Sequence, residues 1–185
     1  MNVKVTIPTS LNDITVRQYQ NIKSLLDNEE LTGVDLDNAI LKVVLGFDEV
    51  ENISKKDKNI LAKDIEKALL NDGSFSQTFE LNGIRFGLIP NFDNISNGEY
   101  IDLIKYSESE DSLHRFLAVC YRPVITKDFF KNYNIETYEG TSKYADVMKE
   151  LPMSIAKGCK GFFLTLLNDL NNYILMSMEA ELKRV

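Results

Sequence analysis

The side chains able to perform catalysis are few in this sequence, and they do not fall into a catalytic spacing. His114 is the single histidine of the 185 residues, and it lies between Asp111 and Arg115. A hydrolase needs a nucleophile and a base that activates it, and no Gly-x-Ser-x-Gly turn presents a serine in that way. An isolated acid–base role for His114 remains an alternative. The favoured interpretation is a position on the surface or in the first turn of a helix.

Cysteines, glycines and acids do not form a metal or phosphate site either. Cys120 and Cys159 each lie within an apolar helical pattern, without a CxxC spacing or a neighbouring histidine, so we expect buried small side chains. Zinc-ligand spacing, the EF-hand order and the phosphate-loop pattern are all missing. Gly158-Cys159-Lys160-Gly161 sits in a helical pattern and indicates close helix packing. The sequence therefore predicts no catalytic, cofactor-binding or metal-binding residues, and a protein that is not an enzyme.

The charge balance disfavours nucleic acid as a direct partner. The net charge is −7, which the phosphate backbone would repel. The nearest basic groups are Lys55, Lys56 and Lys58, which have Asp57 among them, and Lys157 with Lys160. We interpret the first group as the solvated start of a helix.

No targeting or membrane segment is expected from the pattern of apolar residues. The first residues lack the hydrophobic run of a signal peptide, and no apolar stretch approaches the about 20 residues of a membrane span. We therefore expect synthesis in a reducing cytoplasm and no membrane partner.

Helices dominate the first part of the chain. Val3-Lys4-Val5-Thr6-Ile7 alternates and predicts an N-terminal strand that Pro8 ends. Thr15 and Gln18 form a capping box before an apolar helical stripe. Two further helices are predicted, one that ends near Gly46 and one that begins at Ser54.

The clearest local signal is a β-hairpin in the middle of the sequence. Phe79-Glu80-Leu81-Asn82-Gly83-Ile84-Arg85-Phe86 has alternating strands around an Asn-Gly pair, which favours a type I′ turn. In that register Leu81 lies opposite Ile84, Phe79 opposite Phe86, and Glu80 opposite Arg85.

The second half of the sequence is again predicted to be mainly helical. Predicted helices begin at Ser96 and at Asp111, a short one runs from Thr126 through Phe130, and another covers 141–151. Residues 135–138 are left open between a short strand and an extended loop. Pro152 is suited to the first position of a last helix that continues to about Lys183.

The last predicted helix is unusually long. About 30 residues would reach about 45 Å, which is more than a compact domain of this size covers. Phe162 and Phe163 are adjacent and point about 100° apart, so we expect one to pack inward and the other to meet a partner. The predicted protein interface comprises Phe162, Phe163, Leu167 and Met178. The alternative is that helices of the same chain enclose the whole element.

Together these patterns predict one α+β fold that is mostly helical. It has an N-terminal strand, one central β-hairpin and seven or eight helices, including the long C-terminal one. Residues 1–185 form a single domain, with the C-terminal helix (152–185) as an assembly element.

Several strings in the second half resemble a family of small virion and morphogenesis proteins of tailed bacteriophages, including crAss-like phages. They are Pro90-Asn91-Phe92-Asp93, Gly98-Glu99-Tyr100-Ile101-Asp102-Leu103, 114–123 (HRFLAVCYRP), 135–141 (IETYEGT), and Leu151-Pro152-Met153-Ser154 with Gly158 and Phe162-Phe163. The resemblance covers roughly 75–170 and implies a phage structural setting; it transfers no functional residue.

On this basis we expect a non-enzymatic structural subunit of the virion, at the neck (head–tail connector) or in the tail. Its partners would be other phage structural proteins, in a homo-oligomeric ring or a hetero-assembly. One alternative is a tail-assembly chaperone that is absent from the mature virion. Another is a small phage enzyme or host-takeover factor, which would need a cleft with perturbed titratable groups.

Overall fold

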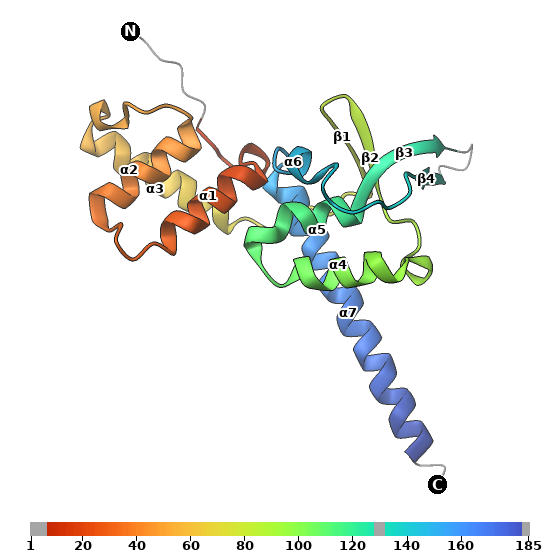
Figure 1. Ribbon diagram of the computed structural model, residues 1–185. Coiled ribbons are helices and arrows are strands. Elements are labelled where there is room, and N and C mark those ends of the chain that lie inside the picture. The colour runs from red at the N-terminus through yellow and green to blue at the C-terminus, as the bar shows by residue number, and fades with distance from the viewer. Residues whose placement is uncertain (1–6, 128–131, 183–185) are drawn as a thin grey trace.

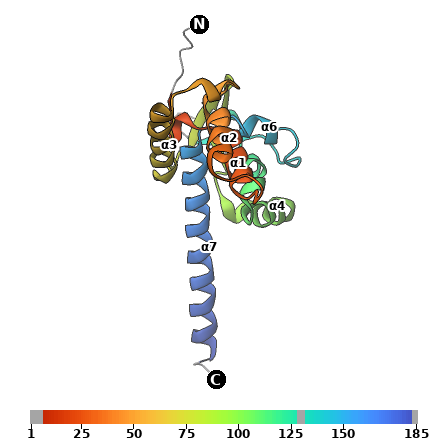
Figure 2. The same cartoon turned by 90° about the vertical axis from the view of Figure 1, so that its left-hand side faces the viewer.

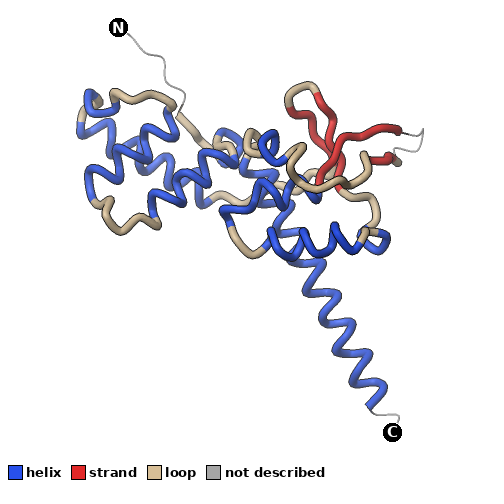
Figure 3. Tube along the Cα trace, in the orientation of Figure 1, coloured by secondary structure: helices blue, strands red, loops and turns tan. Residues whose placement is uncertain are grey.

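The computed structural model describes residues 7–127 and 132–182, and its class is α+β, as expected. Within these residues there are seven α-helices and a four-stranded antiparallel sheet (Figure 1). The helices α1, α2 and α3 form a lobe at one end, and the sheet packs with α4, α5 and the first half of α7 in a larger body (Figures 1 and 3). The bounds are α1 Val16–Leu26, α2 Gly33–Leu45, α3 Lys55–Leu70, β1 Thr78–Leu81, β2 Ile84–Leu88, α4 Asn97–Ser107, α5 Leu113–Cys120, β3 Tyr121–Lys127, β4 Tyr133–Ile135, α6 Ala145–Met148 and α7 Met153–Leu182.

The predicted starts of three helices are confirmed by their caps. Thr15 and Gln18 form a capping box at α1, and Ser96 and Glu99 form another at α4. Ser54 accepts a hydrogen bond from the Asp57 amide at the start of α3. Each cap satisfies amide groups that have no partner within the helix itself.

The predicted hairpin is present in the expected register. Leu81 lies opposite Ile84, and Phe79 lies opposite Phe86, with their rings stacked at 5.6 Å between centroids. Asn82 and Gly83 have φ of 52° and 74°, as a type I′ turn requires. The Arg85 guanidinium donates a hydrogen bond to the Thr78 hydroxyl.

The prediction of a single hairpin was incomplete, because two more strands extend the sheet in the order β1-β2-β3-β4. β3 begins directly where α5 ends, and Pro123 inside it pairs with Phe86 of β2. The predicted short helix from Thr126 through Phe130 is contradicted at its start, since Thr126 and Lys127 belong to β3 and pair with β4 across an irregular register. The rest of that prediction, 128–130, lies outside the described residues. A proline next to the end of a predicted helix indicates only that the helix stops. It gives no sign of the strand that begins at Tyr121, so this strand was not predicted.

Two other expectations differ from the structure. The predicted helix over 141–151 is reduced to α6, which is flanked by turns on both sides. After α6 the amides of Lys149, Glu150 and Leu151 donate to carbonyls three residues back, as in tighter turns. The predicted N-terminal strand falls almost wholly on residues 1–6, which lie outside the described residues, and Ile7 is not in a strand.

The core is divided into two clusters. The larger one lies under the sheet and around α5 and the first half of α7, and includes Phe86, Phe116, Tyr121 and Phe163. The smaller one fills the lobe of α1–α3, and Leu69 contacts both clusters. The lobe and the body are therefore joined by packing as well as by the chain.

Candidate protein-interaction surface

The first half of α7 is fixed within the body of the protein. Ala156, Cys159 and Phe163 are buried on one face, and the Phe163 ring meets Phe116 edge-on at 5.2 Å. Gly158 lies against the loop before β1 so closely that a Cβ there would approach the Ser74 carbonyl carbon to 2.4 Å. The close approach expected of a small residue is present at Gly158, but its neighbour is a loop and not a second helix, and a Cβ on Gly161 would meet nothing within 4 Å.

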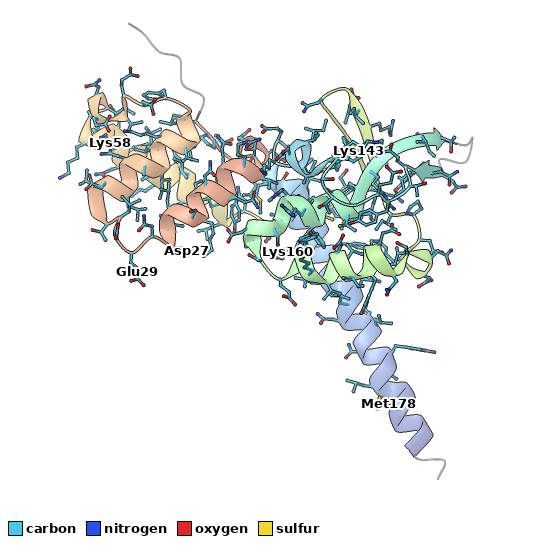
Figure 4. All side chains as sticks on the ribbon, in the orientation of Figure 1. Asp27, Glu29, Lys58, Lys143, Lys160 and Met178 are labelled. Carbon is cyan, nitrogen blue, oxygen red and sulfur yellow. The ribbon has the colours of Figure 1, made fainter. Side chains whose placement is uncertain are left out.

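The four residues predicted as an interface fall into different surroundings. Phe163 is only 3% exposed and belongs to the chain's own core, so it is not available to a partner; Leu167 packs partly against the same core. Phe162 is 36% exposed and stacks on Phe75 at 4.6 Å. Met178 is 56% exposed and lies on the projecting end of α7 (Figure 4). Of the two adjacent phenylalanines, Phe163 packs inward, as expected of one of them, whereas Phe162 lies partly exposed against Phe75 and Phe92 of the same chain.

The second half of α7 runs clear of the rest of the described chain. Figures 1 and 2 show it extending below the body in two perpendicular views, with no other element beside it. Leu167 is the last residue of the helix that packs against the core, and at 1.5 Å per residue the part after it, 168–182, spans about 22 Å. Five large apolar side chains on this part are exposed to solvent, namely Leu170, Tyr173, Leu175, Met176 and Met178, and Leu164 just before it is exposed as well.

These exposed side chains do not share one stripe. Residues two apart point about 200° apart on a helix, so Tyr173 and Leu175 lie on opposite sides, and both are more than half exposed. A helix that is apolar on more than one side is ordinarily enclosed by protein or membrane. None of the helices in the described part of the chain has the length and apolar content to cross a membrane.

A second unfilled apolar surface lies on the lobe. A groove of about 320 Å³ opens between α1, α2 and α3. Ile22, Leu41 and Ile65 are buried at its base, while Leu26 and Leu70 on its walls are 54% and 76% exposed. Asp37 and Glu66 are the only charged residues among its described lining.

His114 lies in a shallow polar depression that Ser24, Asp111 and Lys149 also line. Among the described residues, its side chain makes a hydrogen-bond contact with Gln20 and with none of those three. Its Nδ1 is 3.1 Å from the Gln20 amide nitrogen, which also donates hydrogen bonds to the carbonyls of Glu110 and Asp111. Burial, with the nearby charges of Lys149 and Arg115, lowers the pKa of His114. The neutral imidazole is therefore favoured, and its Nδ1 lies where it can accept a hydrogen bond from the Gln20 amide.

The cysteines are buried, as expected. Cys120 and Cys159 are free thiols with no solvent exposure. Burial, and then the neighbouring Cys159, raises the pKa of Cys120 well above its usual value, so the reactive thiolate is disfavoured. In the described ranges, no group of three or more histidine, cysteine and acidic side chains is arranged to hold a metal ion.

A buried ion pair near the sheet was not anticipated from the sequence. Arg122 Nη1 lies 2.6 Å from Glu99 Oε1, both side chains are about nine-tenths buried, and the guanidinium lies over the Tyr138 ring at 5.5 Å. Arg122 Nε is buried without a hydrogen-bond partner among the described residues. Because the two charges neutralise each other and that nitrogen is closed to solvent, the pair is a structural feature of the α4–β3 contact.

Comparison of the chain with protein-family models, with curated proteins and with solved structures gives no match in any of the three.

The sequence contained a signal for the distal part of α7 but a weak one for the groove. The length of the predicted last helix and the apolar residues on several of its sides identified α7 as a candidate assembly element. The groove is formed by Leu26, Ile40 and Leu70 from three separate helices, and their proximity depends on how those helices pack.

Proposed function

We propose that this chain is a non-enzymatic structural subunit of a tailed-phage virion, at the neck or in the tail, and that it acts by protein–protein assembly. The observation that supports assembly is the exposed second half of α7. The phage setting is supported by the resemblance of the segments in 75–170.

A helix that remains free in water lacks the packing contacts that would stabilise it. Helices in proteins derive most of their stability from packing an apolar face, and large exposed apolar patches on soluble proteins mark interaction sites. Tyr173, Met176 and Met178 are side chains of the kinds that are enriched in interface cores. Contact with another chain would bury these side chains.

The proposal is tested by protein mass spectrometry of purified phage particles. A virion subunit is present in a fixed ratio to the major structural proteins after the particles are washed at high salt. Absence from mature particles, with presence in infected cells, contradicts the structural role.

That contrary outcome would favour a second candidate function, a tail-assembly chaperone. The groove between α1, α2 and α3 supports it, since an open apolar groove is how many proteins hold a helical segment of a client. Such a protein would be recovered with its client from infected cells and would be missing from washed virions.

A further inference from the structure

A small pocket lies on the face of the sheet that points away from the larger core cluster, and all four strands of Figure 1 contribute to it. Phe86 of β2 is buried in that cluster, so its neighbours Arg85 and Gly87 point to the opposite face. The pocket has a volume of about 150 Å³, and its lining residues are Gln77, Thr78, Arg85, Val124, Lys127 and Tyr133. None of them belongs to the surfaces described above for assembly.

Gly87 and Tyr133 give this pocket its shape. A Cβ on Gly87 would approach the Tyr133 ring to 2.5 Å and a Val124 methyl to 3.0 Å. The ring therefore lies across β2 where a side chain is missing. The Tyr133 hydroxyl holds the ring there by donating a hydrogen bond to the Leu88 carbonyl at 2.9 Å. One wall of the pocket is thus fixed by packing and by a hydrogen bond.

The charged residues of the described lining are Arg85 and Lys127, although the whole chain has a net charge of −7. Arg85 donates a hydrogen bond to the Thr78 hydroxyl at 3.3 Å. Within 7–127 and 132–182, neither Arg85 nor Lys127 forms an ion pair. Glu80 lies opposite Arg85 in the hairpin but does not line the pocket. Two positive charges without an acidic partner therefore border the same small space.

We propose that this pocket binds a phosphate group, either as the free ion or as a small phosphate monoester. A phosphate monoester has three strong acceptor oxygens and up to two negative charges near pH 7. The pocket offers the guanidinium of Arg85 and the ammonium of Lys127, and both kinds of cation bind phosphate oxygens. The Thr78 hydroxyl accepts its hydrogen bond from Arg85, so its own proton remains to be donated. Three donors are thus available for three acceptors.

The volume of the pocket limits its ligand to a small one. An apolar cavity of about 150 Å³ accommodates one benzene molecule, so a pocket of the same volume has room for a phosphate ion and not for a whole nucleotide. A nucleic-acid chain is disfavoured, because a protein with a net charge of −7 repels a polyanion. The inference does not depend on the proposed virion role.

The experiment follows the backbone amides of the full-length chain by nuclear magnetic resonance while sodium phosphate is added. Sodium chloride keeps the ionic strength constant, so that general screening does not change. We expect saturable shifts at the amides of Thr78, Arg85 and Lys127, with a dissociation constant of about 1 mM. Acetate, which carries a single charge, should bind at least about 10-fold more weakly.

A parallel titration with O-phosphoserine distinguishes the two sources of the phosphate group. Equal affinity for both compounds indicates that the free ion is the ligand. Tighter binding of O-phosphoserine indicates a phosphate that is carried by a small molecule.

Four variants test the residues, and circular dichroism establishes that each is folded. Arg85→Gln and Lys127→Gln each remove one charged donor and should weaken phosphate binding by at least about 10-fold. Glu80→Gln should not weaken it, because a carboxylate offers no donor to an anion. Lys63→Gln makes the same change of charge on an exposed lysine of α3 and should leave the affinity unchanged.

Three results would overturn the inference. They are the absence of saturable shifts at phosphate concentrations well above the expected dissociation constant, an equal loss of affinity in Lys63→Gln and Lys127→Gln, and acetate binding as tight as phosphate binding. Micromolar binding of a DNA oligonucleotide through Arg85 and Lys127 would likewise reject a small ligand in favour of nucleic acid. The presence or absence of the chain in virions is decided separately, by the mass spectrometry of particles.

Discussion

At the scale of single residues, the buried pair of Glu99 and Arg122 is the most exacting feature. Glu99 serves twice: one oxygen accepts the Ser96 amide in the capping box, and the other pairs with Arg122. Burial raises the pKa of Glu99, but the amide and hydroxyl of Ser96 and then Arg122 outweigh it, so the net pKa lies below the usual value. The ionised form is thus favoured in the folded chain.

Glu99→Gln should lower the free energy of unfolding by about 3 kcal/mol at neutral pH, because it leaves the Arg122 charge buried without its partner. Since the folded pKa of Glu99 is lowered, its contribution is complete above the unfolded pKa and is lost as the pH falls through the folded value. The difference between native and variant should therefore shrink in acid, as measured by urea unfolding at several pH values. Glu80→Gln, on the exposed side of β1, is the control and should stay within about 0.5 kcal/mol. A difference that does not change with pH would show that the pair is not responsible.

Ser24 and Asp111 line the same depression as His114, but among the described residues the imidazole makes its hydrogen-bond contact with the Gln20 amide and with neither of them. We therefore expect the role of His114 to be local packing. His114→Ala should leave assembly and infection largely unchanged, as measured by particle yield and plaque formation. If a folded, assembling His114→Ala protein lost a measurable chemical activity, the protein would belong to the enzyme class instead.

At the scale of elements, the two glycines near the start of α7 differ in what surrounds them. A Cβ on Gly158 would meet backbone atoms of Ser74 and Phe75 within 2.6 Å, whereas a Cβ on Gly161 would meet nothing within 4 Å. The loop before β1 is held there by the Ser74 amide, which donates to the Ser154 carbonyl. Gly158 is therefore a contact between two segments that are about half the chain apart.

Gly158→Ala should destabilise the protein by about 1–3 kcal/mol through overpacking. Gly161→Ala is the matched control in the same helix and should be neutral or stabilising by up to about 1 kcal/mol, because alanine has the higher helix propensity. Thermal and urea unfolding of the two variants provide the comparison. Equal losses in both would mean that the close approach at Gly158 does not matter.

Elements that are defined by adjacent residues were predictable, and those defined by distant partners were not. The Asn82-Gly83 turn and the Thr15 cap are set within a few positions, and both were found as expected. β3 forms because β2 and β4 lie on either side of it, and no local signal next to Pro123 indicates those neighbours. The groove and the Glu99–Arg122 pair depend on distant partners in the same way.

At the scale of the whole molecule, α7 has two separate roles. Its first half completes the core, and none of the described side chains after Leu167 packs against that core. The boundary lies near Leu167, the last residue of the helix that packs against the larger cluster.

Deletion of 175–185 should change the free energy of unfolding by less than about 0.5 kcal/mol and should abolish incorporation into particles. Phe163→Ala, in the same helix, should cost about 3–5 kcal/mol, because it empties a buried aromatic position. Unfolding curves and immunoblots of purified particles test the two statements. Normal incorporation of the shortened chain would contradict an assembly role for the end of α7.

The join between α1 and the start of α7 has a consequence for how the chain is made. The amides of Val16 and Arg17 donate to the carbonyls of Leu151 and Lys149, and the Met153 amide donates to the Ile14 carbonyl. A ribosome releases the first of these segments long before the second, and domains generally fold in the order of synthesis. The α1–α3 cluster can collapse while translation continues, but its orientation on the body is set only after residue 153 has emerged. We therefore expect biogenesis in two steps, in which the lobe forms first and attaches to the body last.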